Sequence, residues 1–170
     1  MTRIRTLLLI APLALLVAAS PLTVVKTSAV VSDPQNELLP KRVPGSVIDY
    51  TTTITNPNGA LTTVAGVTFS DAVPANTILS VADLGLLPGS GPVVFTDGLT
   101  PPSLLTYSYT SLGSTADRLD FSSDNGATWT YTPVADADGY DSRVTNIRVR
   151  LSGNQVAGSS FSIRFRVKVR

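Results

Sequence analysis

Hydrophobic and polar residues alternate with a period of two along three stretches of the chain. In SVIDYTTTIT, every second residue from Ile48 to Ile54 shares one face, while the residues between them share the other. In FSIRFRVKVR (161–170), the odd positions are apolar and the even positions are serine, arginine or lysine. NIRVRL (146–151) repeats the arrangement on a shorter scale. Because this period is typical of a strand with one face in a core, the sequence predicts three amphipathic β-strands.

Further strands are indicated by runs rich in Val, Ile, Thr, Tyr and Phe, which Pro, Gly, Asn and Asp interrupt. These runs are 22–31, 64–70, 77–81, 92–96, 104–109, 119–122 and 128–132. No window of ten residues shows a helical stripe. Many short strands separated by turn signals indicate an all-β fold, an antiparallel β-sandwich, and their uneven lengths disfavour a barrel. We expect the strands at 146–151 and 161–170 to pair as neighbours.

The first twenty residues have the organisation of a secretory signal peptide. Arg3 and Arg5 form a basic start, 7–18 is an apolar core, and the small residues at 17–19 provide a cleavage site. The apolar run is shorter than the ~20 residues of a transmembrane helix, and a retained signal anchor is the alternative. The sequence thus predicts a signal peptide at 1–20 and a single domain at 21–170 with no transmembrane helix after cleavage. The expected location is secreted: the extracellular space or cell surface, with the periplasm as the alternative.

The charge and the missing residue types narrow the function classes. The chain has 13 Lys and Arg against 12 Asp and Glu; without Arg3 and Arg5, 11 basic residues remain and the net charge is −1. This balance argues against nucleic-acid binding. The chain holds no cysteine and no histidine, which excludes disulfides, thiol catalysis, zinc–thiolate sites and a Ser-His-Asp triad. We therefore expect a protein that is not an enzyme and has no catalytic residues or cofactor.

Several motifs occur in an order that resembles a known bacterial family. KTS (26–28) is followed by PGSVIDYTTTITN (44–56) and GVTFSDAVPANTIL (66–79), with SSDNGATW, VTNIRVRLSG and VAGSSFSIRFRVKV downstream. This series resembles the bacterial surface repeat module called domain of unknown function 11, over about 22–169. The resemblance implies an immunoglobulin-like antiparallel β-sandwich on a bacterial exterior and implies no catalytic residues. Family members often occur as tandem copies in stalks, whereas this chain has one copy.

One motif raises the question of glycan chemistry. FSSDNGATWTY (121–131) contains S-x-D-x-G-x-T-W, which resembles the Asp box of sialidases and other glycan-active proteins. Asp124 and Gly126 have the chemistry of a hairpin turn, because Asp bonds nearby backbone and Gly tolerates a positive φ. Sialidase-like enzymes carry several boxes, an arginine cluster and a tyrosine nucleophile, whereas one box is present here. We expect a structural turn against which Trp129 packs.

A second acidic segment, DADGYD (136–141), groups three carboxylates, those of Asp136, Asp138 and Asp141. Carboxylate oxygens are calcium ligands, but the spacing is not that of an EF-hand, because Gly is fourth and the twelfth position is Ile147. A solvated turn is the expected structure, and a looser calcium site is the alternative.

Seven of the 11 basic residues of the mature chain lie in the last 28 positions. Alternation places most of them on exposed strand faces, and a candidate interaction face contains Arg148, Arg150, Arg164, Arg166 and Lys168. Like charges that face one another across strands cost stability, so something must offset them. One explanation is protection of exposed strands against sheet-to-sheet pairing. The other is an acidic partner, either 117–141 of another copy, which holds six Asp, or an anionic polysaccharide.

These features predict a non-catalytic, exported structural or adhesive module, a subunit of an extracellular assembly, whose partners are copies of itself or other surface proteins. One route to association is strand addition, in which 22–31 completes a neighbour's sheet. The alternative is that this segment is an ordinary first strand of its own domain. The alternative function is a carbohydrate- or cell-surface-binding module, for which Trp129 and several tyrosines are aromatic candidates. Lys26 also fits one end of the Lys–Asn isopeptide crosslinks that some surface sandwiches carry, but the last strand has no Asn.

Overall fold

The structure is a computed structural model that describes residues 19–59 and 61–170. The predicted signal peptide therefore lies outside the described residues except for its last two positions. Within the described residues the regular secondary structure is β-strand alone. The strands are β1 (Thr23–Ser32), β2 (Val47–Thr55), β3 (Val64–Ala65), β4 (Thr68–Ala72), β5 (Thr77–Ser80), β6 (Val93–Asp97), β7 (Leu119–Ser122), β8 (Tyr140–Asp141), β9 (Asn146–Arg150), β10 (Asn154–Gln155) and β11 (Ser160–Val169). None of this part of the chain forms a helix suited in length and hydrophobicity to cross a membrane.

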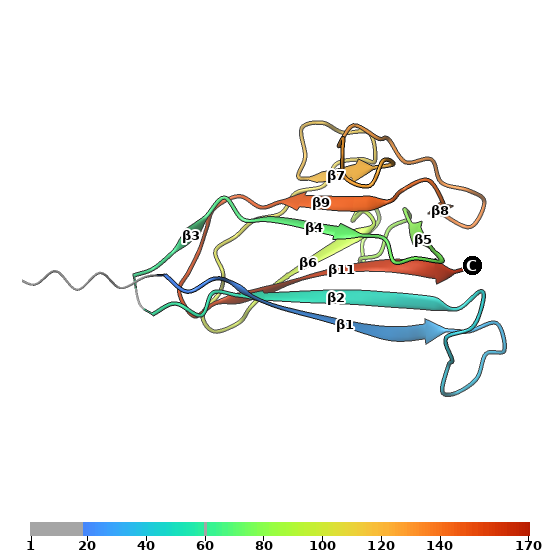
Figure 1. The fold of residues 1–170 in the computed structure, drawn as a ribbon, viewed down its shortest axis with the longest axis horizontal. Helices are drawn as coiled ribbons and strands as arrows, with labels where there is room; N and C mark the ends of the chain where they lie inside the picture. The colour runs from blue at the N-terminus through green and yellow to red at the C-terminus, as the bar shows by residue number, and fades with distance from the viewer. Residues whose placement is uncertain (1–18, 60) are drawn as a thin grey trace, which may run out of the picture.

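The strands form two layers, as Figure 1 shows. In the first sheet the order is β1-β2-β11-β5-β8, and β6 pairs with the first half of β11 while β5 pairs with its end. The second sheet has the order β4-β9-β7, and β3 with β10 forms a short ribbon at one end. All of these pairs are antiparallel. The prediction of an all-β fold with antiparallel sheets is therefore confirmed.

The core lies between the two layers and follows the predicted alternation. In β2, β9 and β11 every second residue is buried, except Tyr50 and Val169, which are half-buried like the residues between them. The largest of these inward side chains come from the centre of the first sheet and from β9: Ile48, Ile54, Ile147, Val149, Phe161, Ile163 and Phe165. Removal of this apolar surface from water stabilises the sandwich. Because the chain has no cysteine to crosslink, burial of this kind carries the stability of the fold.

Some predicted strands differ from the structure. The run 64–70 is divided into β3 and β4 at Gly66, which has a φ of +66°. The runs 104–109 and 128–132 are not strands, since each makes only one isolated bridge to another segment. The expectation that 146–151 and 161–170 pair as neighbours is wrong: β9 lies between β4 and β7 in the second sheet, whereas β11 lies in the first. Alternation identifies the buried face of a strand, but it contains no information about its partner.

The first strand, β1, forms an edge of the first sheet. It pairs with β2 over its whole length, from Thr23 opposite Thr55 to Ser32 opposite Val47, with a bulge after Val30. The segment 22–31 is thus part of its own domain, which is the ordinary reading of a first strand. Within the described residues β1 pairs with β2 alone, and its other side carries no strand.

Candidate functional site

The predicted basic residues do not form one face. Arg148 and Arg150 lie on β9 and Arg164 and Arg166 on β11, in each case at the positions between buried residues. They therefore lie on the outer faces of two different sheets, on opposite sides of the core. The candidate interaction face is divided into two arginine pairs, and each pair holds an aspartate of the same chain.

On the first sheet, Asp49 of β2 bridges the two arginines of β11. Its carboxylate accepts hydrogen bonds from Arg164 Nη1 at 2.7 Å and from Arg166 Nε and Nη2 at 2.7 and 3.0 Å. Burial alone raises the pKa of Asp49, but the bonds from Arg166 and Arg164 outweigh it and hold that pKa below its usual value. The pKa of Arg166 is raised by its bond to Asp49. The repulsion expected between these arginines is thus offset within the molecule.

On the second sheet, Asp120 of β7 has the same role. Its Oδ2 accepts from Arg148 Nε at 2.9 Å and Arg150 Nε at 2.7 Å, and its Oδ1 accepts from Arg150 Nη2 at 3.1 Å. The guanidinium of Arg148 also lies 4.6 Å from the ring of Trp129, within cation–π range. The remaining predicted base, Lys168, bonds Asp138 at 2.9 Å.

The structure thus pairs these basic residues with aspartates of the same chain, without a second copy. Asp120 and Asp138 belong to the acidic segment 117–141 that the sequence suggested as an intermolecular partner. Asp49 was not identified from the sequence as a site residue, although it was visible as the one charged side chain on the outer face of the 46–55 strand.

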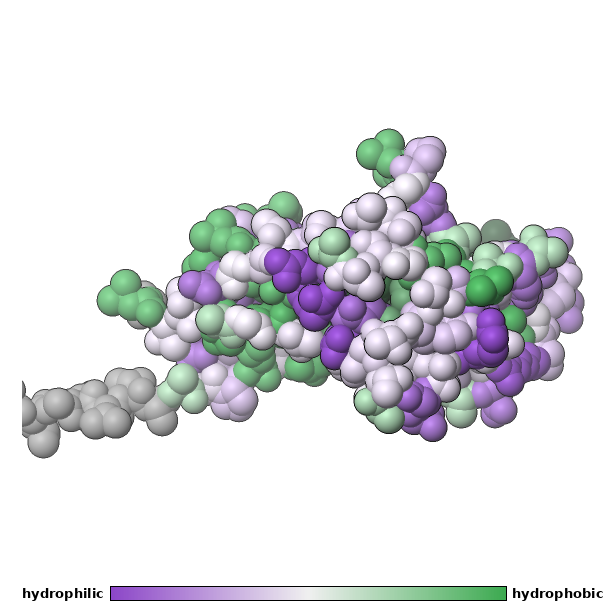
Figure 2. All heavy atoms as spheres, turned by 90° about the horizontal axis from the view of Figure 1, so that it is seen from above, coloured by the Kyte–Doolittle hydropathy of each residue, from purple (hydrophilic) through white to green (hydrophobic). Residues whose placement is uncertain are grey.

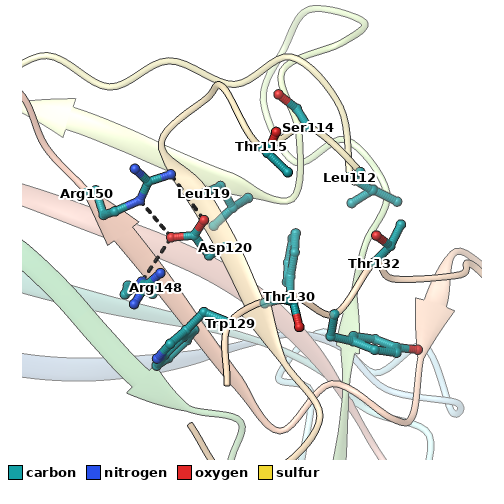
Figure 3. Close-up of a pocket in the computed structure, with 13 residues that line it drawn as sticks. Leu112, Ser114, Thr115, Leu119, Asp120, Trp129, Thr130, Thr132, Arg148 and Arg150 are labelled. Atoms are coloured by element: carbon teal, nitrogen blue, oxygen red, sulfur yellow. Dashed lines mark hydrogen bonds and ion pairs between the residues drawn. The ribbon is translucent and has the colours of Figure 1, made fainter. Parts of the chain in front are cut away.

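The arginine pair of the second sheet borders a pocket of about 270 Å³. Figure 3 shows Asp120 held between Arg148 and Arg150 on one side, with Trp129 below Arg148. The other side is formed by hydroxyl-bearing residues from two loops: Ser114, Thr115, Thr130 and Thr132. Figure 2, which looks onto the β7–β9 side, shows hydrophilic side chains gathered into a patch on this face. We call this pocket the Trp129 groove.

The Asp-box residues form a turn, as the sequence predicted. Asn125 and Gly126 have φ values of +59° and +83°, the left-handed conformation that such hairpin turns need. The Asp124 carboxylate accepts hydrogen bonds from the Ser122 hydroxyl and from both the backbone and the hydroxyl of Thr128. These bonds lower the pKa of Asp124 to about 2. The side chains of Ser122, Asp124 and Thr128 thus bond one another and the backbone of the turn.

The three carboxylates of the calcium alternative have separate partners. Asp136 accepts from the backbone of Asp138 and Tyr140, and the carboxylate of Asp138 pairs with a lysine. Asp141 is buried and accepts from the Tyr131 hydroxyl at 2.7 Å and from the backbone of Val134. In the described part of the chain no three acidic side chains are grouped as a metal site would require. The structure does not bring these residues into one cage.

The β1 edge is the second candidate surface. Its exposed valines include Val24 and Val25, which are 62% and 59% exposed. Its one charged side chain, Lys26, is on the face toward the second sheet and is 35% exposed; Nζ lies 2.6 Å from Asp71 Oδ2 on β4 and 5.1 Å from the ring centre of Tyr50. This edge therefore presents backbone, valines and threonines to solvent, and the guanidinium of Arg42, in the loop that follows, donates to the Ser28 hydroxyl.

Comparison with known proteins adds no relative. No family model matches the chain. No curated protein matches it, and no solved structure matches it.

Proposed function

We propose that the protein is a non-catalytic, exported module that acts through surface contacts, as a structural or adhesive subunit of an extracellular assembly. The observation that carries the proposal is the β1 edge, because a ten-residue strand at a sheet edge offers a row of backbone donors and acceptors to another strand. The proposed partners are copies of the same chain or other surface proteins. Immunoglobulin-like topology and membership of the surface-repeat family belong to this proposal and rest on the order of the sequence motifs.

The chemistry of the polar residues supports a role without catalysis. The carboxylates of Asp49, Asp120 and Asp124 are all engaged by neighbouring side chains, and the chain contains no histidine for proton transfer at neutral pH. Catalysis by a carboxylate pair needs two acids of which one is raised in pKa. Every Asp for which the structure indicates a shift has a lowered pKa.

The state in which cells release the protein tests this function. Producing cells are separated into medium, surface-bound and periplasmic fractions, and the protein in each fraction is sized and viewed by electron microscopy. We expect surface-bound or high-mass material. Recovery of free monomer alone, at every concentration, would contradict the assembly.

A second candidate function is binding of carbohydrate at the Trp129 groove. The observation that favours it is an aromatic ring beside charged and hydroxyl groups, a combination that suits the apolar faces and hydroxyls of a sugar. A glycan array tests this function with the natural chain and with the variants Trp129→Ala and Thr130→Ala. Specific signals that both substitutions weaken, while Tyr140→Ala does not, would support binding there; an array without specific signals would remove this candidate.

A further inference from the structure

We infer that two copies of the chain associate through their β1 edges, antiparallel across a twofold axis at Thr27, so that the two first sheets become one continuous sheet. This inference rests on the proposed assembly function and specifies its contact. The occupant of the edge is thus a second β1.

The β1 edge has few of the features by which edge strands avoid pairing: one bulge after Val30, near its end, and one lysine that turns toward the second sheet. Such strands are usually short, interrupted by Pro, or armed with outward-pointing Lys. Here the strand has ten residues without Pro. Its one lysine is paired with Asp71 at 2.6 Å, and the guanidinium of Arg42, in the loop that follows, donates to the Ser28 hydroxyl.

The sequence of β1 is close to symmetric about Thr27. Residues directly opposite one another in an antiparallel pair point to the same face of the sheet. If both copies keep their inner faces inward, opposed residues are both odd-numbered or both even-numbered, so their residue numbers add up to an even number. A sum of 54 places Val24 opposite Val30 of the second copy and Val25 opposite Ala29, with Thr27 opposite itself. Cross-strand contacts between apolar β-branched side chains stabilise such pairs. A shift to a sum of 52 would place Lys26 opposite Lys26, which like-charge repulsion disfavours.

An apolar groove at the beginning of β1 is covered in the same arrangement. It has a volume of about 240 Å³ and is lined by side chains from both layers, among them Val24, Phe69 and Phe161. Antiparallel pairing brings the end of the second β1, and the loop that follows it, beside this end of the first. That loop extends past the unpaired side of β1 in Figure 1 and carries Leu38 and Leu39, which are 97% and 81% exposed. Both exposed features thus lie where the second copy would contact them.

Single cysteines test the register, because the natural chain contains none. The full chain, expressed and processed in an exporting host, is prepared as Thr27→Cys and as Thr23→Cys and is oxidised gently. Cysteines at 27 face one another at about 4.5–5.5 Å between Cα atoms, within disulfide range. Cysteines at 23 lie eight positions apart along the pair, about 26 Å. We expect a covalent dimer for Thr27→Cys and none for Thr23→Cys.

An edge charge tests the contact without a crosslink. Val25→Lys adds a lysine to the exposed edge, while Val134→Lys adds one at a loop valine of equal exposure, 62% against 59%. Sedimentation velocity should show self-association of the natural chain and of Val134→Lys, with a dissociation constant at least about tenfold weaker for Val25→Lys. Circular dichroism and thermal melting establish that each variant is folded.

The outcomes separate the inference from the function. A natural chain that associates while Thr27→Cys gives no covalent dimer, or while Val25→Lys has no effect, overturns the β1 contact and leaves assembly by another surface. Surface-bound material that contains a different protein on β1 also overturns the self-pairing. A chain that stays monomeric at all concentrations and is released as monomer overturns both.

Discussion

Replacement of Asp49 by asparagine removes the charge that holds Arg164 and Arg166 together while keeping the size of the side chain. Three hydrogen bonds of 2.7 to 3.0 Å are affected. Bonds to charged groups contribute about 1.5–3 kcal/mol each, but not additively. The arginine side chains are 33% and 30% exposed, and solvent screening reduces the sum. We therefore expect a loss of about 2 kcal/mol in the free energy of unfolding, with a fall in melting temperature of about 4–8 °C for a domain of this size.

The loss of stability caused by Asp49→Asn should be larger at neutral pH than at acidic pH. Because the pKa of Asp49 is lowered in the folded chain from 3.8, its contribution is present above about pH 4 and is lost as pH falls through the folded pKa. The difference in free energy of unfolding between the natural chain and Asp49→Asn should thus be greatest at neutral pH and shrink below about pH 4. Urea unfolding followed by circular dichroism, repeated over this pH range, measures it.

The control is an ion pair of the same chemistry in a more exposed setting. Glu37 pairs with Lys41 at 2.9 Å, with side chains 41% and 68% exposed, so Glu37→Gln should cost less than about 0.5 kcal/mol. Equal costs for Asp49→Asn and Glu37→Gln, or a difference that is the same at every pH, would refute the argument that Asp49 offsets the arginine repulsion.

Three further predictions concern the turns and the space between the layers. Asp124→Ala should lower the melting temperature in a thermal scan because it removes the acceptor that holds the Asp-box turn, while Ser123→Ala should leave it unchanged. Lys26→Met should cost about 1–2 kcal/mol in urea unfolding, since it leaves Asp71 unpaired, and adding Asp71→Leu should restore much of that loss. An intact mass one water lower than that of the purified chain's sequence would show instead that the two side chains are covalently joined. Calcium or a chelator should leave the melting temperature unchanged, because the carboxylates at 136–141 have separate partners; a rise with calcium would contradict this.

The alternating pattern was sufficient to predict the buried faces of β2, β9 and β11. In these strands each inward position is an apolar residue or a threonine, and burial follows the period of two. The runs 104–109 and 128–132 have similar composition but make only isolated bridges. Strand formation depends on a neighbour with which to pair, and tertiary contacts decide whether one is present.

The ion-pair clusters could not be predicted from the sequence in the same way. Asp49 is 115 and 117 positions from its two arginines, and only the order of strands in the first sheet brings them together. The Asp-box turn was predictable because the bonds to the Asp124 carboxylate, which shape it, lie within 122–128. Local chemistry was thus accessible from the sequence, whereas partners distant in the chain required the topology.

Hydrogen exchange along β1 tests the central claim most directly. Residues 21–170 are labelled in deuterated buffer over a hundredfold range of protein concentration, with β11 in the middle of the same sheet as the internal reference. Association through the edge predicts that β1 amides become more protected as concentration rises, while those of β11 stay protected throughout. Exchange of β1 that is fast and identical at every concentration would contradict the account.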